Sequence, residues 1–203
     1  MDFKMRKLIP EHEINVDLTS YVDTNGRVFE WSGGIFRGIV PERGPFYREL
    51  VERGVLRNLQ QEKLVVQTEV TPLQLDGYGL VLKHSKIPFL TYCVEWPAPM
   101  LKKAALLTLE INIRLVNCDL VLQDAYPWNV YFEGTKPVFI DIGSIVPIDE
   151  NIIWVAYHQF CRFFCIRFTC ILWAKVELQD IFSATIGMGS QMTSLKENYL
   201  CLI

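Results

Sequence analysis

The sequence predicts an α+β fold, with a small β-rich N-terminal part that includes one helix and a C-terminal part that is mostly helical. Three observations lead to this prediction. Residues 27–31 and 35–40 are short apolar runs between glycine-containing turns, which is typical of antiparallel strands. Apolar residues recur with helical spacing at 45–60 and 99–116. A second hairpin pattern follows at 130–140.

The N-terminal elements are predicted from turn residues and periodicity. Asp-Thr-Asn-Gly at 23–26 is a tight turn, because asparagine and glycine tolerate positive φ angles. The helix at 45–60 has an apolar stripe and a polar face, and Gly54 is its weakest point. Residues 63–70 and 78–84 are predicted as two further strands.

The C-terminal elements begin with an extended aromatic segment at 87–96. The helix at 99–116 starts with a proline, which is well placed in a first turn, and its apolar residues cover most of its circumference. Such a helix is mostly buried. A long aromatic helix is predicted at about 150–178, and residues 181–203 are interpreted as a poorly ordered tail or a truncation point.

Composition narrows the function classes. Half of the 203 residues are apolar and the formal net charge is −3, so neither nucleic acid nor an anionic membrane is an expected partner. The N-terminus lacks a signal-peptide core, which favours a cytoplasmic location. Residues 152–174 are long enough to span a bilayer, but they include Arg162 and Arg167, so a buried or interfacial helix is expected instead.

The cysteines have neither disulfide-framework nor zinc-ligand spacing. They stand singly in apolar sequence without a CxxC pair, so we expect reduced core residues of an intracellular protein, at Cys93, Cys118, Cys161, Cys165, Cys170 and Cys201.

Polar residues border the hairpin at 130–140 on both sides. Asp124 and Asn129 precede its first strand, and Asp141 follows its second. The two ends of a short hairpin converge, so these side chains could offer oxygen ligands to a hard divalent cation and a base for a hydroxyl. Each residue alone could instead cap a turn.

The same residues resemble the protein-kinase-like superfamily, which includes aminoglycoside phosphotransferases. Asp124-Ala-Tyr-Pro-Trp-Asn129 has the spacing of its Asp-x-x-Pro-x-Asn catalytic loop, and Asp141-Ile-Gly143, twelve residues after Asn129, resembles its Asp-Phe-Gly motif. The resemblance implies a kinase-like fold that binds Mg²⁺ and ATP. It implies Asp124 as the catalytic base, with Asn129 and Asp141 as metal ligands.

The residues with which that superfamily binds the nucleotide phosphates are replaced in this chain. Arg37 stands in the strand where the family has a lysine, with Glu49 or Glu52 of the next helix as its expected partner. Arg37 and Glu49 are therefore the candidate cofactor-binding residues. An arginine on a strand is more often a solvated edge residue than a phosphate ligand, and that interpretation is favoured for Arg37. The chain has no GxGxxG loop, which indicates weak or absent catalysis.

The kinase resemblance also implies a division of the chain. Residues 1–95 would form a kinase-like N-lobe, 96–180 a truncated, mostly helical C-lobe with the catalytic-loop hairpin, and 181–203 the tail. Trp96 and Trp128 could stack on an adenine, although core positions are favoured for both.

A narrower resemblance covers about residues 23–162. Phrases such as Glu95-Trp-Pro97, Lys136-Pro-Val-Phe-Ile-Asp141 and Ala156-Tyr-His-Gln-Phe-Cys-Arg162 are similar to a bacterial family labelled class I S-adenosylmethionine-dependent methyltransferase, which includes nodulation-type proteins. There, a kinase-like region precedes the methyltransferase domain. S-adenosylmethionine would then be used only through a missing or partner domain.

Three functions follow from these resemblances. The main hypothesis is a non-catalytic or weakly active kinase-like module (a pseudokinase) that serves a methyltransferase domain or a neighbouring protein. The alternative is an ATP- and Mg²⁺-dependent phosphotransferase acting on a small-molecule or glycan-type acceptor. The second alternative is a methyltransferase, as the family label states.

Overall fold

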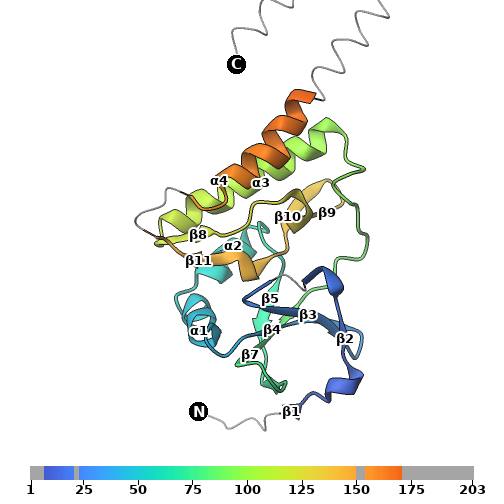
Figure 1. The fold of residues 1–203 in the computed structure, drawn as a ribbon, viewed down its shortest axis with the longest axis vertical. Helices are drawn as coiled ribbons and strands as arrows, with labels where there is room; N and C mark the ends of the chain where they lie inside the picture. The colour runs from blue at the N-terminus through green and yellow to red at the C-terminus, as the bar shows by residue number, and fades with distance from the viewer. Residues whose placement is uncertain (1–6, 21–22, 150–153, 171–203) are drawn as a thin grey trace, which may run out of the picture.

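The computed structural model describes residues 7–20, 23–149 and 154–170 (Figure 1). Its largest sheet has five antiparallel strands in the order β2-β3-β4-β7-β5. Their bounds are Asn15–Val16, Gly26–Trp31, Gly34–Ile39, Leu80–His84 and Thr68–Val70. The predicted strands at 27–31 and 35–40 are thereby confirmed. A short parallel pair, β1 (Lys7–Leu8) and β6 (Leu73–Gln74), forms a separate sheet.

The predicted helix at 45–60 is two helices, α1 (Gly44–Glu52) and α2 (Val55–Gln61). The break lies at Gly54, whose φ of 75° is in the left-handed region. A glycine adopts this conformation without steric cost, and one such residue redirects the chain. The prediction of one continuous helix was therefore wrong at the residue it identified as weakest.

The predicted strand at 63–70 is shorter than expected, because only Thr68–Val70 joins the large sheet. The preceding residues pair with the second hairpin instead: Val66 N–H donates to Phe139 O at 2.9 Å, and Phe139 N–H donates to Leu64 O at 2.9 Å. Residues 87–96, predicted as extended, contain bends and a turn but no strand.

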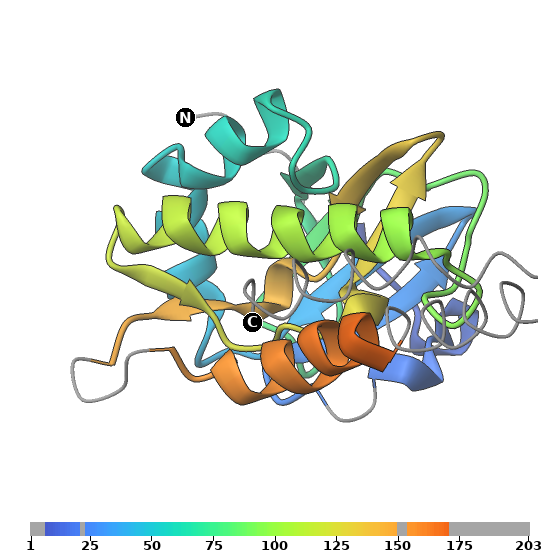
Figure 2. The same cartoon turned by 90° about the horizontal axis from the view of Figure 1, so that it is seen from above.

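The described residues of the C-terminal part contain two more strand pairs and the longest of the described helices. Helix α3 (Ala98–Val116) leads into β8 (Leu120–Leu122), which pairs with β11 (Ile145–Pro147). Strands β9 (Val130–Glu133) and β10 (Lys136–Phe139) form the predicted hairpin. Seen from above, α3 runs lengthwise between α2 and the last described helix (Figure 2).

The last helix starts later than predicted. It consists of α4 (Tyr157–Phe160), a π-helical turn (Cys161–Cys165) and further helix to residue 170. The remainder of the predicted helix and the tail at 181–203 lie outside the described residues. None of the described helices combines the length and apolarity that a membrane crossing requires.

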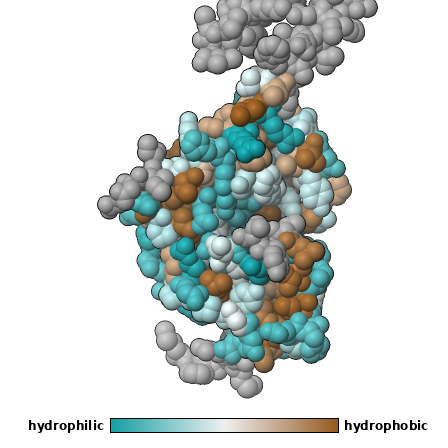
Figure 3. All heavy atoms as spheres, viewed as in Figure 1, coloured by the Kyte–Doolittle hydropathy of each residue, from teal (hydrophilic) through white to brown (hydrophobic). Residues whose placement is uncertain are grey.

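Both faces of the large sheet are covered by apolar residues. The main core joins the sheet to the C-terminal part and includes Leu82, Ile111 and Phe139, all fully buried. A smaller cluster on the other face contains Phe29 and Phe36. In Figure 3 apolar residues also gather on the surface, and the exposed large apolar side chains of the segment after β7 are Phe89, Leu90, Tyr92 and Val94.

The described cysteines are free thiols, in agreement with the prediction, but none is buried. Cys165 and Cys170 are exposed, because they lie on the outer side of the last helix rather than in the core. Cys201 lies outside the described residues.

Candidate functional site

The two loops that border the second hairpin are joined by Ser144, a buried residue. Its hydroxyl accepts a hydrogen bond from Asp124 N–H at 2.9 Å and donates to Asp124 O at 3.2 Å. Its carbonyl accepts from Gln123 N–H at 2.7 Å. The loop that contains Asp124 and the loop that follows Asp141 are therefore fixed against each other.

Three residues predicted around the hairpin lie near one another. The Asn129 amide donates to Asp141 Oδ2 at 3.4 Å, and the Asn129 carbonyl accepts from Ile140 N–H at 2.9 Å. Burial raises the pKa of the Asp141 carboxyl; Arg37 opposes this effect, whereas the charges of Asp23 and Asp124 add to it. The hairpin thus brings Asn129 and Asp141 together, with Asp124 close enough to interact electrostatically.

Arg37 on β4 lies between two carboxylates. Its Nη2 donates to Asp141 Oδ1 at 2.8 Å, and its Nη1 donates to Asp23 Oδ2. The arginine side chain is only 7% exposed, against 20% for Asp141 and 21% for Asp23. A Cβ at Gly143 would clash with the same Nη1, so a larger residue there would displace the Arg37 guanidinium. We call Asp23, Arg37, Asp141 and Gly143 the Asp141 end of the site.

The prediction that Arg37 pairs with Glu49 or Glu52 was wrong. Glu49 is exposed on α1, where it pairs with Arg53 at 3.6 Å, and Glu52 is exposed as well. Asp23 takes the place expected for a helix glutamate. The sequence assigned Asp23 to a turn only, and that assignment left its side chain without a role. The sequence showed only that Asp23 is a residue type common in turns, and this preference does not identify a partner distant in the sequence.

Two uncharged donors hold the same segment from the N-terminal side. The Asn25 amide donates to Gly143 O at 2.9 Å, and the Tyr47 hydroxyl donates to the same oxygen at 2.7 Å. Burial raises the pKa of the Tyr47 phenol, although the positive charge of Arg37 opposes this, so the hydroxyl remains a neutral donor. Both residues were missed by sequence reasoning.

The other end of the site is built differently. Asp124 Oδ1 accepts a hydrogen bond from Gln159 Nε2 at 3.0 Å, and Gln159 Oε1 accepts from Ala125 N–H at 3.0 Å. Thus one carboxamide from α4 orients both the carboxylate and its loop. We call Asp124, Gln159, Tyr126 and Trp128 the Asp124 end of the site.

An aromatic group lies beside Asp124. The rings of Tyr126 and Trp128 stack at a centroid distance of 4.2 Å, and both contact the edge or face of Phe163. Trp128 is 48% exposed, so its predicted core position was wrong. Trp96 is buried, in agreement with its prediction, and packs against Phe132.

The residues present do not fit a magnesium ion held by Asn129 and Asp141. One oxygen of Asp141 already faces a guanidinium and the other faces an amide N–H donor. A metal ion would have to approach a carboxylate beside the positively charged guanidinium that Asp141 shares with Asp23. Within the described ranges, no group of three or more His, Cys, Asp or Glu residues is placed to hold a metal ion.

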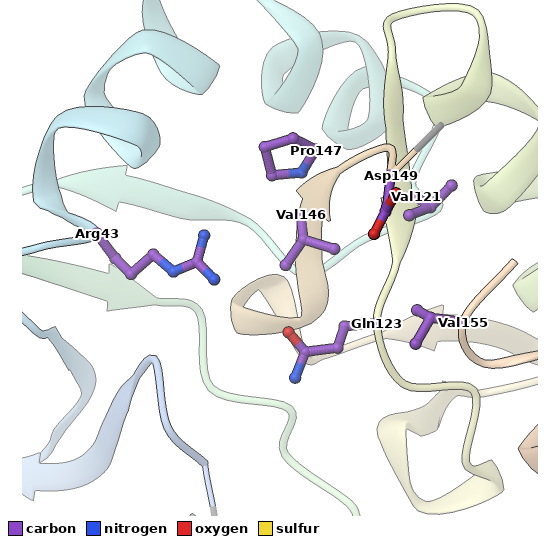
Figure 4. Close-up of a pocket in the computed structure, with 7 residues that line it drawn as sticks. All are labelled: Arg43, Val121, Gln123, Val146, Pro147, Asp149 and Val155. Carbon is purple, nitrogen blue, oxygen red and sulfur yellow. The ribbon is translucent and has the colours of Figure 1, made fainter. Parts of the chain in front are cut away.

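The structure has a pocket beside the site rather than at it (Figure 4). It is an open, mostly apolar hollow of about 430 Å³ next to the β8–β11 pair. Val121, Val146 and Val155 line it, with Arg43 and Asp149 toward opposite ends. Gln123, which also lines it, precedes Asp124 directly, but the predicted site residues do not line this pocket.

No protein-family model matches the chain. Over 151 residues it is 31% identical to "Nodulation protein NoeA" of Rhizobium meliloti (strain 1021). The match takes in 72% of this chain but 32% of that protein, so the chain spans about a third of the length of its relative. Similarity to nodulation-type proteins, which the sequence phrases indicated, is thus found over most of the chain.

Proposed function

We propose that this chain is a kinase-like module without phosphotransferase activity, and that it serves a methyltransferase-related, nodulation-type protein. The single observation that carries the non-catalytic part is the double ion pair of Arg37. Phosphoryl transfer depends on positioning and on cations that neutralise phosphate charge. Here the guanidinium of Arg37 already occupies one oxygen of the carboxylate that would hold the metal, and it pairs with Asp23 as well.

The kinase-like part of the proposal is supported by element order. An antiparallel five-stranded sheet has helices between its third and fourth strands along the chain, and a long helix then leads to the hairpin bordered by Asp124, Asn129 and Asp141. This is the order expected for the kinase-like fold that the Asp-x-x-Pro-x-Asn spacing suggests. A similar fold alone does not establish activity, so we base the choice between an active and an inactive module on the residues of the site.

The methyltransferase part is supported by the match to NoeA together with the resemblance of the sequence phrases to a methyltransferase family. Because the match takes in about a third of that relative, a methyl-transfer domain would belong to another part of the polypeptide or to a neighbouring protein. The acceptor, whether a small molecule or a glycan, would be bound there or at the Asp124 end.

The test is calorimetric titration of the chain with ATP, with and without Mg²⁺. We expect no Mg²⁺-dependent, saturable binding by the wild type, and the same result for Asp141→Asn. If the wild type binds Mg²⁺·ATP and Asp141→Asn does not, the site is a working metal site and the proposal is wrong. Phosphate release that is lost in Asp124→Asn would identify the phosphotransferase alternative.

A second candidate function is methyl transfer by this chain itself, which the NoeA match favours. It is tested by titrating the isolated chain with S-adenosylmethionine. A flat isotherm is expected if the chain serves a separate methyltransferase domain. A saturable isotherm would assign donor binding to this chain and would replace the first proposal.

A further inference from the structure

Two buried polar atoms on the main-core side of the large sheet have no hydrogen-bond partner among the described residues. They are Arg37 Nε and His84 Nε2. The two residues are 6% and 7% exposed, respectively. Leaving a buried donor or acceptor unpaired costs free energy, so buried polar groups in folded proteins are almost always satisfied by protein or by bound water.

The strand register places these residues next to each other. Arg37 lies opposite Leu82 in the β4–β7 pair, and Ile35 lies opposite His84. Arg37 and His84 are therefore diagonal neighbours on one face of the sheet, at about 7–8 Å between their backbones, a separation that long side chains can close. The charge of Arg37 is also felt at the His84 ring, since it contributes to lowering the pKa of that ring.

The chemical character of each atom follows from its neighbours. The Thr68 hydroxyl has one proton and lies 3.1 Å from Val66 O and 2.8 Å from His84 Nδ1. We assign that proton to the Val66 O contact, which makes the ring Nδ1–H the donor to Thr68 Oγ1. Burial, followed by the charge of Arg37, lowers the pKa of His84 to about 3, so the ring is neutral at pH 7. His84 Nε2 is therefore an acceptor, whereas Arg37 Nε–H is a donor.

We propose that Arg37 Nε–H and His84 Nε2 form a buried binding site for one neutral hydrogen-bonding group, namely a water molecule that accepts from Arg37 and donates to His84. Two hydrogen bonds of about 2.9 Å each let one water span roughly 5–6 Å between the protein atoms. Buried waters commonly join such pairs of groups.

The charges around the site favour a neutral occupant. A cation would be repelled by Arg37, whose guanidinium is held by Asp23 and Asp141. An anion would face the lone pair of His84 Nε2 and offer it no proton. Water satisfies both atoms because it is donor and acceptor at once.

Crystallography of the free chain at a resolution that shows ordered water tests the proposal directly. We expect a density peak within hydrogen-bond distance of both Arg37 Nε and His84 Nε2. The peak should be lost in His84→Leu and kept in Lys83→Gln, a matched change at the neighbouring residue, whose side chain is exposed on the opposite face. No peak in the wild type, or a peak that persists in His84→Leu, would overturn the site.

A measurement on the wild type alone decides the question if His84→Leu does not fold. Nitrogen-15 NMR of the histidine ring distinguishes a protonated from an unprotonated Nε2. We expect the proton on Nδ1 and an Nε2 that accepts a hydrogen bond. A proton on Nε2 would turn that atom into a second donor, and a water bridge in the proposed direction could not form.

Discussion

The two ends of the candidate site differ in how their carboxylates are balanced. At the Asp141 end a buried arginine pairs with two aspartates, and a glycine lies against the guanidinium. At the Asp124 end the carboxylate is held by a neutral carboxamide, beside a half-exposed tryptophan. One carboxylate is paired with a buried cation, whereas the other is bound by a neutral amide.

From this difference we expect the two ends to contribute unequally to stability and to ligand binding. A buried charged pair is costly to break, because removing one partner leaves the other charge without compensation. A partly exposed carboxylate held by one amide is cheap to disturb, since water can replace the lost hydrogen bond. We therefore expect substitutions at the Asp141 end to act mainly on stability, and those at the Asp124 end to act mainly on binding.

The largest effect is expected for Arg37→Met, which keeps the length of the side chain but removes its charge. Asp23 and Asp141 would be left close together without a counter-charge, and the free energy of unfolding should fall by about 3–5 kcal/mol. Urea denaturation measures this. Arg57→Met, at an exposed position of α2, is the control and should change stability by less than about 0.5 kcal/mol. Equal effects would contradict the distinction between the ends.

The next effect concerns pH. The unfolded chain protonates His84 near pH 6.5, whereas the folded chain does so only near pH 3, because burial and then Arg37 lower its pKa. Between these values the unfolded state binds more protons, so stability falls as the pH falls. The slope from this group is about 1.4 kcal/mol per pH unit, or roughly 2–3 kcal/mol between pH 6 and pH 4.

The same denaturation series in His84→Gln isolates that contribution. The stability of this variant should depend less on pH in that window, whatever its absolute stability. Asp141 has the opposite sign, since burial raises its pKa and the folded state then binds the extra proton. A variant slope equal to that of the wild type would exclude His84 as the source.

Gly143→Ala tests the close packing around Arg37. The new methyl group would clash with Nη1, and the guanidinium cannot retreat without breaking its ion pairs. A loss of about 1–3 kcal/mol is expected, as for other overpacked sites. The matched control is Gly44→Ala, where the nearest atoms to an added Cβ are 3.6 Å away, so little change is expected. A neutral Gly143→Ala would mean that Arg37 is loosely held.

Tyr47→Phe removes one of the two donors to Gly143 O while Asn25 still satisfies that oxygen. Stability should fall by about 1 kcal/mol, the usual net value of a hydrogen bond. Thermal unfolding gives the comparison with Tyr92→Phe, whose ring is exposed and which should behave as wild type. A loss as large as that of Arg37→Met would show that the phenol, rather than the charge, closes this end.

A similarly small effect is expected at the Asp124 end. Gln159→Leu removes the hydrogen bonds to Asp124 and Ala125, and the free energy of unfolding should fall by about 1 kcal/mol, because water can replace the bond to the partly exposed Asp124 carboxylate. Gln61→Leu, at an exposed position, is the control for the added apolar surface. The same urea series serves. A loss above about 3 kcal/mol, as for a broken buried ion pair, would show that the Asp124 end contributes as much to stability as the Asp141 end.

Several elements could be predicted because they depend on residues close in the sequence. The Ser32-Gly33 turn between β3 and β4, the long helix α3 and the second hairpin all rest on local turn residues or periodicity. The tight turn predicted at 23–26 was wrong, because neither Asn25 nor Gly26 has a positive φ angle. The hairpin also determined that Asn129 and Asp141 approach each other. Gly54 could be identified as a weak point, but whether it ends a helix depends on how α1 and α2 pack.

Pairings between distant residues were decided only by the tertiary structure. Asp23 lies 14 residues from Arg37, and Asp141 lies 104 residues from it, so no helical or strand spacing relates them. Gln159 and Asp124 meet for the same reason, because α4 packs beside the loop. The order of residues along the chain was enough to show which charged and polar residues border the hairpin. Which of them contact each other depends on the tertiary structure. A buried charge is stable only beside a partner, and the packing of the core sets which groups lie close enough to pair.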